Sequence, residues 1–386
     1  MTERYDESTR AVRAGLESDA ETGAVVPPLH LTSTFAFRGF GDKRKYDYSR
    51  SGNPTRDQLA AAINDLEGGA GAVVTASGMA AITLVGHLLP SGSRIVAPHD
   101  CYGGTFRLFT AWQRRGELKV DFIDFGRAGE LERALADPAA LVWIETPSNP
   151  LLRITDIEAV ARLAHARGAL VVVDNTFLSP AWQQPLRFGA DIVVHSTTKY
   201  LNGHSDVVGG AAVARSAELA EQLAWWANCL GLTGAPFDSF LTLRGIRTLH
   251  ARLAVHARNA HAIAEWAASQ PQIKHVYYPG LPSHPGHAIA QRQQRGFGAI
   301  VSLELHGGTA AVQRFVEGLE LFSLAESLGG VESLVAHPAT MTHAAMEPAA
   351  RAAAGLVDGL LRLSVGIESV EDLLRDLAAA VARTAH

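Results

Sequence analysis

Short apolar runs that end in polar residues recur along the middle of the chain. One run, residues 170–173, leads to Asp174, and another leads through Val193 and Val194 to Ser196 and Lys199. Four to eight apolar residues bounded by polar loops are typical of strands buried on both faces of a parallel sheet. Because ligands bind such sheets outside the carboxyl ends of the strands, we expect Asp174 and Lys199 on one rim.

Strands and helices alternate from residue 56 to about residue 200. Besides the two strands above, the pattern predicts strands over 72–75, 94–97 and 141–145, and helices over 56–66, 77–87 and 157–167. Such alternation predicts an α/β fold with a mostly parallel central sheet. The last third differs, since helices near 249–269 and 309–317 flank strands over 299–305 and 360–365. This part is predicted to form a smaller C-terminal α+β domain.

The first 56 residues look irregular. They contain the breaker signals Pro27-Pro28, Thr32-Ser33-Thr34 and Gly52-Asn53-Pro54. A structureless stretch of this length is unusual inside a compact domain. We therefore expect an arm over 1–56 that packs on something else, such as a second subunit, followed by an α/β domain over 57–248 and the C-terminal domain over 249–386.

Composition narrows the class of protein. The chain has 386 residues, of which 47% are hydrophobic and 19% are charged, and its formal net charge is -5. These values indicate a globular chain and favour neither nucleic acid nor an anionic membrane as a partner. No run of 18 apolar residues is present and the start is polar, so we expect a cytoplasmic protein. Cys101 and Cys229 predict no metal site and no disulfide.

The predicted rim carries residues that suit pyridoxal phosphate (PLP). Lys199 can form an imine with the cofactor, Asp174 can hold the pyridinium proton, and the hydroxyls beside Lys199 can meet the phosphate. Ser77, Gly78 and Met79 begin a helix whose free N–H groups would stabilise a phosphate, although they could be an ordinary helix start.

Two further residues follow predicted strands. Tyr102 could stack on a flat cofactor or simply pack, and Asn149 could donate to a ring oxygen or build a turn. Motifs for nucleotide binding, zinc hydrolysis and the serine nucleophile elbow are absent from the sequence. His99, His195 and His204 are expected to be solvated or hydrogen-bonded rather than metal ligands.

Several segments resemble the Cys/Met-metabolism PLP enzymes, in the order in which they occur in that family. They are Tyr48–Thr55, Ser77–Met79, Tyr102–Thr105, Pro147–Pro150, Asp174–Phe177 and Ser196–His204. Residues Trp225–Asn228, Ala325–Ser333 and Met341–His343 are similar to bacterial members that perform γ-replacement.

The resemblance implies a fold type I PLP-dependent transferase and a role for each cofactor contact. Lys199 would carry the imine, Asp174 the pyridinium contact and Tyr102 the ring stacking. Gly78, Met79, Ser196 and Thr198 would bind the phosphate, with Ser77 beside them, and Asn149 would be a further cofactor contact. Tyr48 and Arg50 would reach the phosphate of the neighbouring subunit, which makes a dimer the minimal active unit. The resemblance implies a homotetramer built as a dimer of such active dimers.

The resemblance also implies the substrates. Arg362, helped by Ser327, would bind the substrate α-carboxylate, whereas without the resemblance it could equally be a solvent-facing arginine on an edge strand. Asp47 and Arg107 favour γ-replacement of the succinyl group of O-succinyl-L-homoserine by L-cysteine, which gives L-cystathionine and succinate. Glu326 indicates a γ-acting member but does not separate replacement from elimination. The sequence leaves three alternatives open: γ-elimination, another acyl group on homoserine, and a catalytically silent PLP-binding protein. The charged side chains of Glu326, Asp47 and Arg107 could also be merely solvated.

Overall fold

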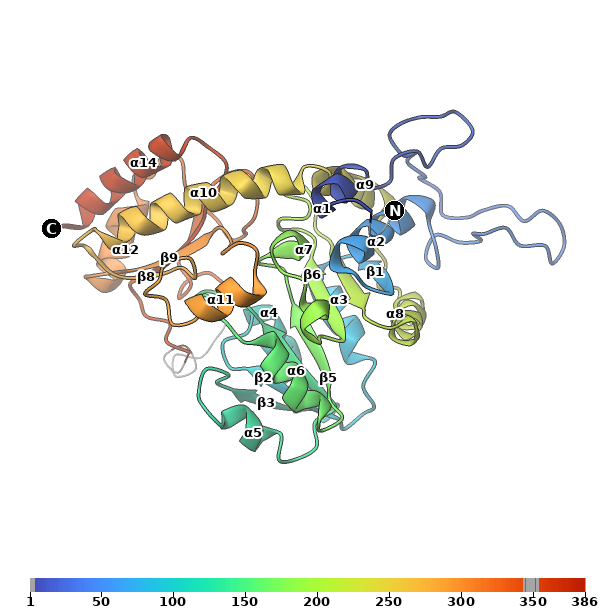
Figure 1. Cartoon of the computed structure of the whole chain (residues 1–386), viewed down its shortest axis with the longest axis horizontal. Coiled ribbons are helices and arrows are strands. Elements are labelled where there is room, and N and C mark those ends of the chain that lie inside the picture. Colours follow the sequence, from blue (N-terminus) through green and yellow to red (C-terminus); the bar gives the residue numbers. More distant parts are fainter. Residues whose placement is uncertain (1–3, 343, 345–350, 352–353, 386) are drawn as a thin grey trace. The chain divides into compact units, whose positions relative to one another are not determined.

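The computed structural model describes residues 4–342, 344, 351 and 354–385 (Figure 1). The chain forms two compact units, and each is built from two separate stretches of sequence. Unit 1 comprises residues 1–93 and 170–250, and unit 2 comprises residues 94–169 and 251–386. The division expected at residues 56 and 248 stays a prediction. Of the segment Met341–His343, His343 lies outside the described residues.

Four strands of unit 1 lie side by side in the order β1-β7-β6-β5. They are β1 (Gly71–Thr75), β5 (Leu170–Asp174), β6 (Ile192–Ser196) and β7 (Gly210–Ala214). β5 and β6 are parallel, as expected, but β7 runs antiparallel to both β1 and β6. No helix separates β6 from β7 in the chain. A parallel return usually requires a helical crossover, which explains the reversed direction.

The helices of unit 1 begin and end at recognisable capping residues. Asn53 caps α2 by accepting from the N–H groups of Thr55 and Arg56, and the helix ends at Gly68, whose φ of 74° is left-handed. Unit 1 contains α1 (Glu7–Val12), α2 (Pro54–Glu67), α3 (Gly78–Gly86), α7 (Ser179–Trp182), η1 (Pro185–Phe188), α8 (Ala217–Leu230) and α9 (Pro236–Ile246).

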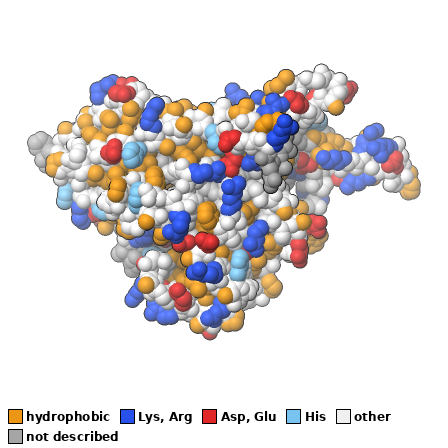
Figure 2. All heavy atoms as spheres, viewed as in Figure 1, with side chains coloured by type: hydrophobic (Ala, Val, Ile, Leu, Met, Phe, Trp, Pro, Cys, Tyr) orange, Lys and Arg blue, Asp and Glu red, His pale blue; other side chains and the backbone are white. Residues whose placement is uncertain are grey.

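The N-terminal arm is extended, apart from the short helix α1, which the sequence analysis did not foresee. Asp6 caps that helix, since its carboxylate accepts from the N–H of Ser8 at 2.8 Å. From there to α2 the chain projects as open loops (Figure 1), with one isolated bridge between Thr34 and Tyr48. Leu31 is 70% exposed and Phe40 is fully exposed. Figure 2 shows basic side chains over this projection, where the sequence holds Arg38, Lys43, Arg44 and Lys45.

Unit 2 contains two groups of paired strands. In the first, β2 (Arg94–Pro98) pairs in parallel with both β3 (Lys119–Ile123) and β4 (Leu141–Glu145). The second has the order β10-β11-β12-β9-β8. Its strands are β8 (Ile273–Tyr277), β9 (Ile300–Leu305), β10 (Ser323–Leu324), β11 (Leu334–Ala336) and β12 (Leu360–Ser364). β12 lies between β11 and β9 and all five of its residues are buried.

Helices accompany both groups of strands in unit 2. They are α4 (Gly103–Arg114), α5 (Glu130–Ala134), α6 (Ile157–His165), α10 (Leu249–Ala268, which begins at the end of unit 1), α11 (His287–Gln293), α12 (Gly308–Val316), α14 (Val370–Ala382) and η2 (Arg383–Ala385). Among the described residues, no helix is long and apolar enough to cross a membrane, and no group of three or more His, Cys, Asp or Glu side chains could hold a metal ion.

Candidate active site

The carboxyl ends of β5 and β6 adjoin in unit 1. Asp174, the last residue of β5, lies opposite Val194 of β6, and Ser196 ends β6. Lys199 follows in a turn, where its N–H donates to the Ser196 carbonyl at 3.3 Å and its carbonyl accepts from the Gly203 N–H at 2.8 Å. Backbone bonds on both sides therefore fix the point from which the Lys199 side chain leaves the chain.

The environment of the Asp174 carboxyl would be stabilised by a nearby cation. Although part of the residue is exposed, burial of its carboxyl raises the pKa of Asp174, while hydrogen bonds from Thr176 and the charge of His195 act in the opposite direction. The Thr176 N–H donates to Oδ1 at 3.0 Å. A nearby positive charge stabilises a buried carboxylate. The protonated ring nitrogen of PLP would supply that charge, so this environment fits the cofactor.

The start of α3 comes close to the end of β6. Ser77 caps the helix, since its Oγ accepts from the Ala80 N–H at 3.1 Å. A Cβ on Gly78 would lie 2.8 Å from the Cβ of Ser196, so only glycine permits this approach. The N–H groups of Gly78 and Met79 belong to the first turn, where they have no carbonyl partner within the helix and can bind an anion. These residues fit the phosphate of PLP.

Thr198 is already hydrogen-bonded to the chain. Its Oγ1 accepts from the Gly209 N–H at 3.0 Å and donates to the Gly209 carbonyl at 3.2 Å. A phosphate oxygen needs a donor, and the hydroxyl has only one proton. The predicted phosphate contact of Thr198 therefore requires its O–H to turn away from Gly209, and it stays a prediction.

The arm residues of the predicted site have their own contacts within unit 1. The guanidinium of Arg50 lies 5.4 Å from the centre of the Tyr48 ring and donates through Nε to Asn228 at 3.1 Å. Asp47 accepts from Lys43 Nζ at 2.7 Å, and hydrogen bonds from Lys43 and Ser51 lower the pKa of Asp47 to about 2. An incoming ammonium group at Asp47 would therefore have to displace Lys43.

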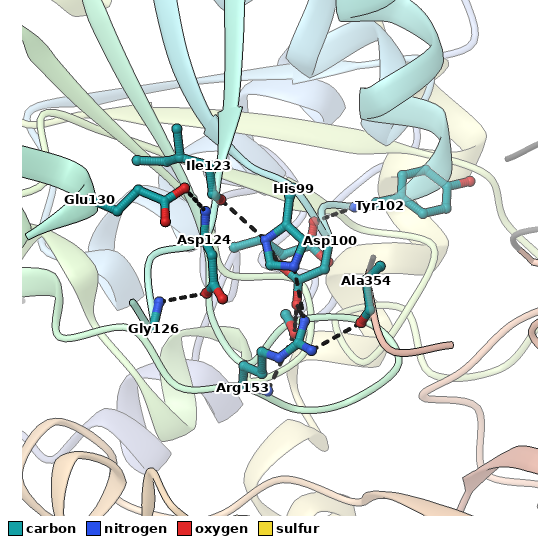
Figure 3. A network of polar contacts seen from close by, with 11 residues as sticks. His99, Asp100, Tyr102, Ile123, Asp124, Gly126, Glu130, Arg153 and Ala354 are labelled. Atoms are coloured by element: carbon teal, nitrogen blue, oxygen red, sulfur yellow. Dashed lines mark hydrogen bonds and ion pairs between the residues drawn. The ribbon is translucent and has the colours of Figure 1, made fainter. Parts of the chain in front are cut away.

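Tyr102 and Arg107 lie at the start of α4 in unit 2. The Tyr102 N–H donates to Glu145 Oε2 at 2.7 Å, which joins the loop after β2 to the last residue of β4. The Tyr102 ring is 39% exposed and points away from the neighbouring polar cluster (Figure 3). The residue is therefore partly accessible, and Arg107 is an exposed cation on the same helix.

Arg362 is buried in unit 2, with 3% of its surface exposed. Its Nη1 donates to Asn149 Oδ1 at 2.9 Å and its Nη2 to the Ser327 carbonyl at 2.7 Å. Arg362 is therefore not an exposed arginine on an edge strand, which was the alternative that the sequence allowed. The contacts bring together Arg362, Ser327 and Asn149, which we predicted separately. Glu326, the neighbour of Ser327, is exposed, so a solvated charge remains a sufficient explanation for it.

A polar cluster that no sequence pattern predicted connects the loops after β2 and β4. Asp100 is 7% exposed and accepts from Ser148 Oγ at 2.8 Å and from Arg153 Nη1 at 2.7 Å (Figure 3). Arg153 Nη2 also donates to the Ala354 carbonyl at 2.9 Å. The cluster thereby ties the residues next to Tyr102 and Asn149 together. The only signal in the sequence was the position of Asp100 in the loop that follows the strand predicted over 94–97.

The chain is similar to curated enzymes that make or break cystathionine. It is 56% identical to cystathionine γ-synthase of Escherichia coli (strain K12), over 96% of each chain. It is 47% identical to cystathionine γ-lyase of Dictyostelium discoideum, over 98% of each chain, and 46% identical to cystathionine β-lyase of Coxiella burnetii, over 97% of each chain.

Solved structures show the same likeness. Cystathionine γ-synthase from Xanthomonas oryzae pv. oryzae in complex with cystathionine has a TM-score of 0.98 and 62% identity, and the match covers 98% of each chain. Cystathionine γ-lyase from Lactobacillus plantarum, complexed with L-serine, has a TM-score of 0.95 and 43% identity, over 98% of this chain and 99% of that one. These likenesses confirm the α/β, fold type I architecture.

The family profile described as Cys/Met metabolism PLP-dependent enzyme matches residues 8–382. PLP is therefore the cofactor, in agreement with the environments of Asp174 and Gly78. On this evidence, the chain belongs to the Cys/Met-metabolism PLP-dependent enzyme family.

Proposed function

We propose that this chain is a cystathionine γ-synthase, which replaces the succinyl group of O-succinyl-L-homoserine with L-cysteine. The observation that carries the proposal is the difference in identity among solved relatives of nearly equal TM-score: 62% to a synthase and 43% to a lyase. The backbone is common to both activities, so the side chains must separate them. Methionine biosynthesis by transsulfuration is the corresponding expected role.

We assign most cofactor contacts to residues of unit 1. Gly78, Met79 and Ser196 hold the phosphate, and Asp174 holds the proton on the ring nitrogen. PLP, when bound, supplies an electron-accepting ring that makes protons of an attached amino acid acidic. We assign ring stacking to Tyr102, because this aromatic residue is exposed.

The proposed chemistry assigns proton movement to one lysine. Arg362 holds the substrate α-carboxylate in a charge-assisted contact, since its guanidinium is buried and oriented by Asn149 and Ser327. The Lys199 amine removes the proton from Cα, gives it up to the bound cofactor, and as a free amine again removes one from Cβ of the substrate. Flexible reach over adjacent carbons explains why no histidine base is needed.

The replacement itself takes place at Cγ. The Cγ–O bond breaks and its electron pair leaves with succinate. The cysteine sulfur then forms the new Cγ–S bond and gives up its proton, and return of protons to Cβ and Cα completes L-cystathionine. Arg107 holds the distal carboxylate of the succinyl group, while Asp47 and Glu326 assist the incoming cysteine.

γ-Elimination by a cystathionine γ-lyase is the second candidate, because lyase relatives match the whole chain at 47% and 43% identity. The deciding experiment incubates the purified protein with O-succinyl-L-homoserine, with and without L-cysteine, and identifies the products by mass. Cystathionine as the main product with cysteine supports the synthase. Faster cleavage of cystathionine than its formation, at matched concentrations, assigns a lyase. No product in either mixture, with PLP bound, indicates a silent binding protein.

We also propose a homotetramer assembled from two active dimers, in which Tyr48 and Arg50 reach the phosphate of a neighbouring subunit. The projecting arm and its exposed Leu31 and Phe40 support an arm that packs on another chain. Light scattering coupled to gel filtration measures the assembly. A fully active monomer would contradict the shared site. We expect a cytoplasmic location.

A further inference from the structure

Glu67 is a buried acid whose position the proposed reaction does not explain. It is the last residue of α2 and has 0% of its surface exposed. A charged side chain is rarely buried to this extent without hydrogen-bonding partners. Its Oε1 is bonded, whereas its Oε2 has no hydrogen-bond partner among the described residues.

Glu67 Oε1 accepts two hydrogen bonds from the ends of two different strands. Nε2 of His195, on β6, lies 2.6 Å away, and Nδ2 of Asn175, just after β5, donates at 2.9 Å. An ionised carboxylate only accepts, so Nε2 of the histidine carries the proton in this contact. His195 is 1% exposed and Asn175 is fully buried. One oxygen atom therefore connects the ends of β5 and β6.

The two donors are direct neighbours of proposed cofactor contacts. Asn175 follows Asp174, and His195 precedes Ser196. Asn175 is further fixed by Gln183, which donates to its Oδ1 at 3.0 Å and accepts from its Nδ2 at 2.8 Å. The charge of His195 also lowers the pKa of Asp174, against the effect of burial. Movement of either donor would shift a cofactor contact.

We propose that Glu67 is a positioning residue for PLP, because its carboxylate fixes Asn175 and His195 and, through them, Asp174 and Ser196. The inference rests on the proposed cofactor roles of those last two residues. Sites that lose such supporting contacts typically bind more weakly because the contacting groups are displaced.

Two substitutions at Glu67 separate charge from hydrogen bonding. Glu67→Gln keeps an oxygen acceptor for both donors and replaces only the unbonded Oε2 with an amide nitrogen. Glu67→Met has a similar length but removes the acceptor of His195 Nε2 and leaves Asn175 Nδ2 with only its hydrogen bond to Gln183. Charged hydrogen bonds are about twice as strong as neutral ones, so we expect PLP to bind roughly fivefold more weakly to Glu67→Gln. For Glu67→Met we expect roughly ten- to a hundredfold weaker binding.

Asp191→Asn is the matched control. Asp191 is 4% exposed and also bridges β5 and β6, since its carboxylate accepts from the Val171 N–H at 2.8 Å and from Arg215. It lies at the opposite end of the two strands, away from Asp174. Asp191→Asn should therefore lower thermal stability but leave PLP affinity within about twofold of the wild type.

The measurement is titration of the apoprotein with PLP, followed by its visible absorbance, together with the melting temperature of each apoprotein. The expected result is a graded loss of affinity from Glu to Gln to Met, with an altered absorbance spectrum of the bound PLP. Wild-type affinity in Glu67→Gln, or an equal loss in Asp191→Asn, would overturn the proposal. If Glu67→Met does not fold, Glu67→Gln decides alone. Failure of the wild type to bind PLP would instead refute the proposed function.

Discussion

Replacement of Arg362 by lysine tests the proposed binding of the substrate carboxylate. Arg362 is buried and donates to Asn149 and to Ser327. Lysine keeps the positive charge but lacks the planar guanidinium of arginine. A lysine ammonium group therefore cannot keep both hydrogen bonds to the protein and also bind a carboxylate through two parallel hydrogen bonds. We therefore expect Arg362→Lys to fold and bind PLP, but to lose affinity for the amino-acid substrate.

The expected loss follows from the hydrogen bonds involved. A hydrogen bond to a charged group contributes about 1.5–3 kcal/mol, so the loss of one such bond lowers kcat/KM roughly tenfold to a hundredfold. The assay compares O-succinyl-L-homoserine with its α-carboxamide, in the presence of saturating cysteine. The wild type should prefer the carboxylate by that factor, and Arg362→Lys should lose most of the preference.

Arg153→Lys provides the control for this prediction. Arg153 also makes two directed contacts in unit 2, to Asp100 and to the Ala354 carbonyl, but we assign it no substrate contact. Its variant should keep the preference for the carboxylate, even if it is less stable. An unchanged preference in Arg362→Lys, with PLP bound, would show that this arginine does not bind the α-carboxylate.

Three further predictions address the assembly, the leaving group and pH. The variants Lys199→Ala and Arg50→Ala should each lose most of the turnover of the wild type. If neighbouring subunits share an active site, oligomers refolded from a mixture of the two variants should regain part of that turnover. Mixed oligomers that regain no turnover would contradict a shared active site. Arg107→Ala should reduce kcat/KM roughly ten- to a hundredfold more for the succinyl than for the acetyl ester, and equal losses would exclude a contact to the distal carboxylate. Burial lowers the pKa of His256 to about 4. Between about pH 6.5 and pH 4 the unfolded state therefore binds more protons than the folded state, so the free energy of unfolding should decrease as the pH falls through that range. In thermal melts, the stability of His256→Gln should depend less on pH than that of the wild type, by about 3 kcal/mol at most over that range. An unchanged dependence of stability on pH would refute this role of His256.

The sequence by itself determined the local elements and the residues at their ends. The apolar run that leads to Asp174 and the segment before Lys199 are β5 and β6. As expected, Asp174 ends β5 and Lys199 lies in the turn after β6. Such patterns are readable because a strand, a helix cap or a turn depends on residues close together in the chain. For the same reason, the motifs around Lys199 were sufficient to predict the cofactor.

Only the tertiary structure decided which distant residues support these elements. Arg362 contacts Asn149 across 213 positions of sequence, and Glu67 reaches His195 across 128. A single arginine or glutamate has no local pattern that distinguishes burial from exposure, so the sequence left Arg362 open and did not single out Glu67. The antiparallel direction of β7 depends likewise on its partners, β1 and β6. Burial and pairing arise from packing between segments, and packing is a property of the folded chain.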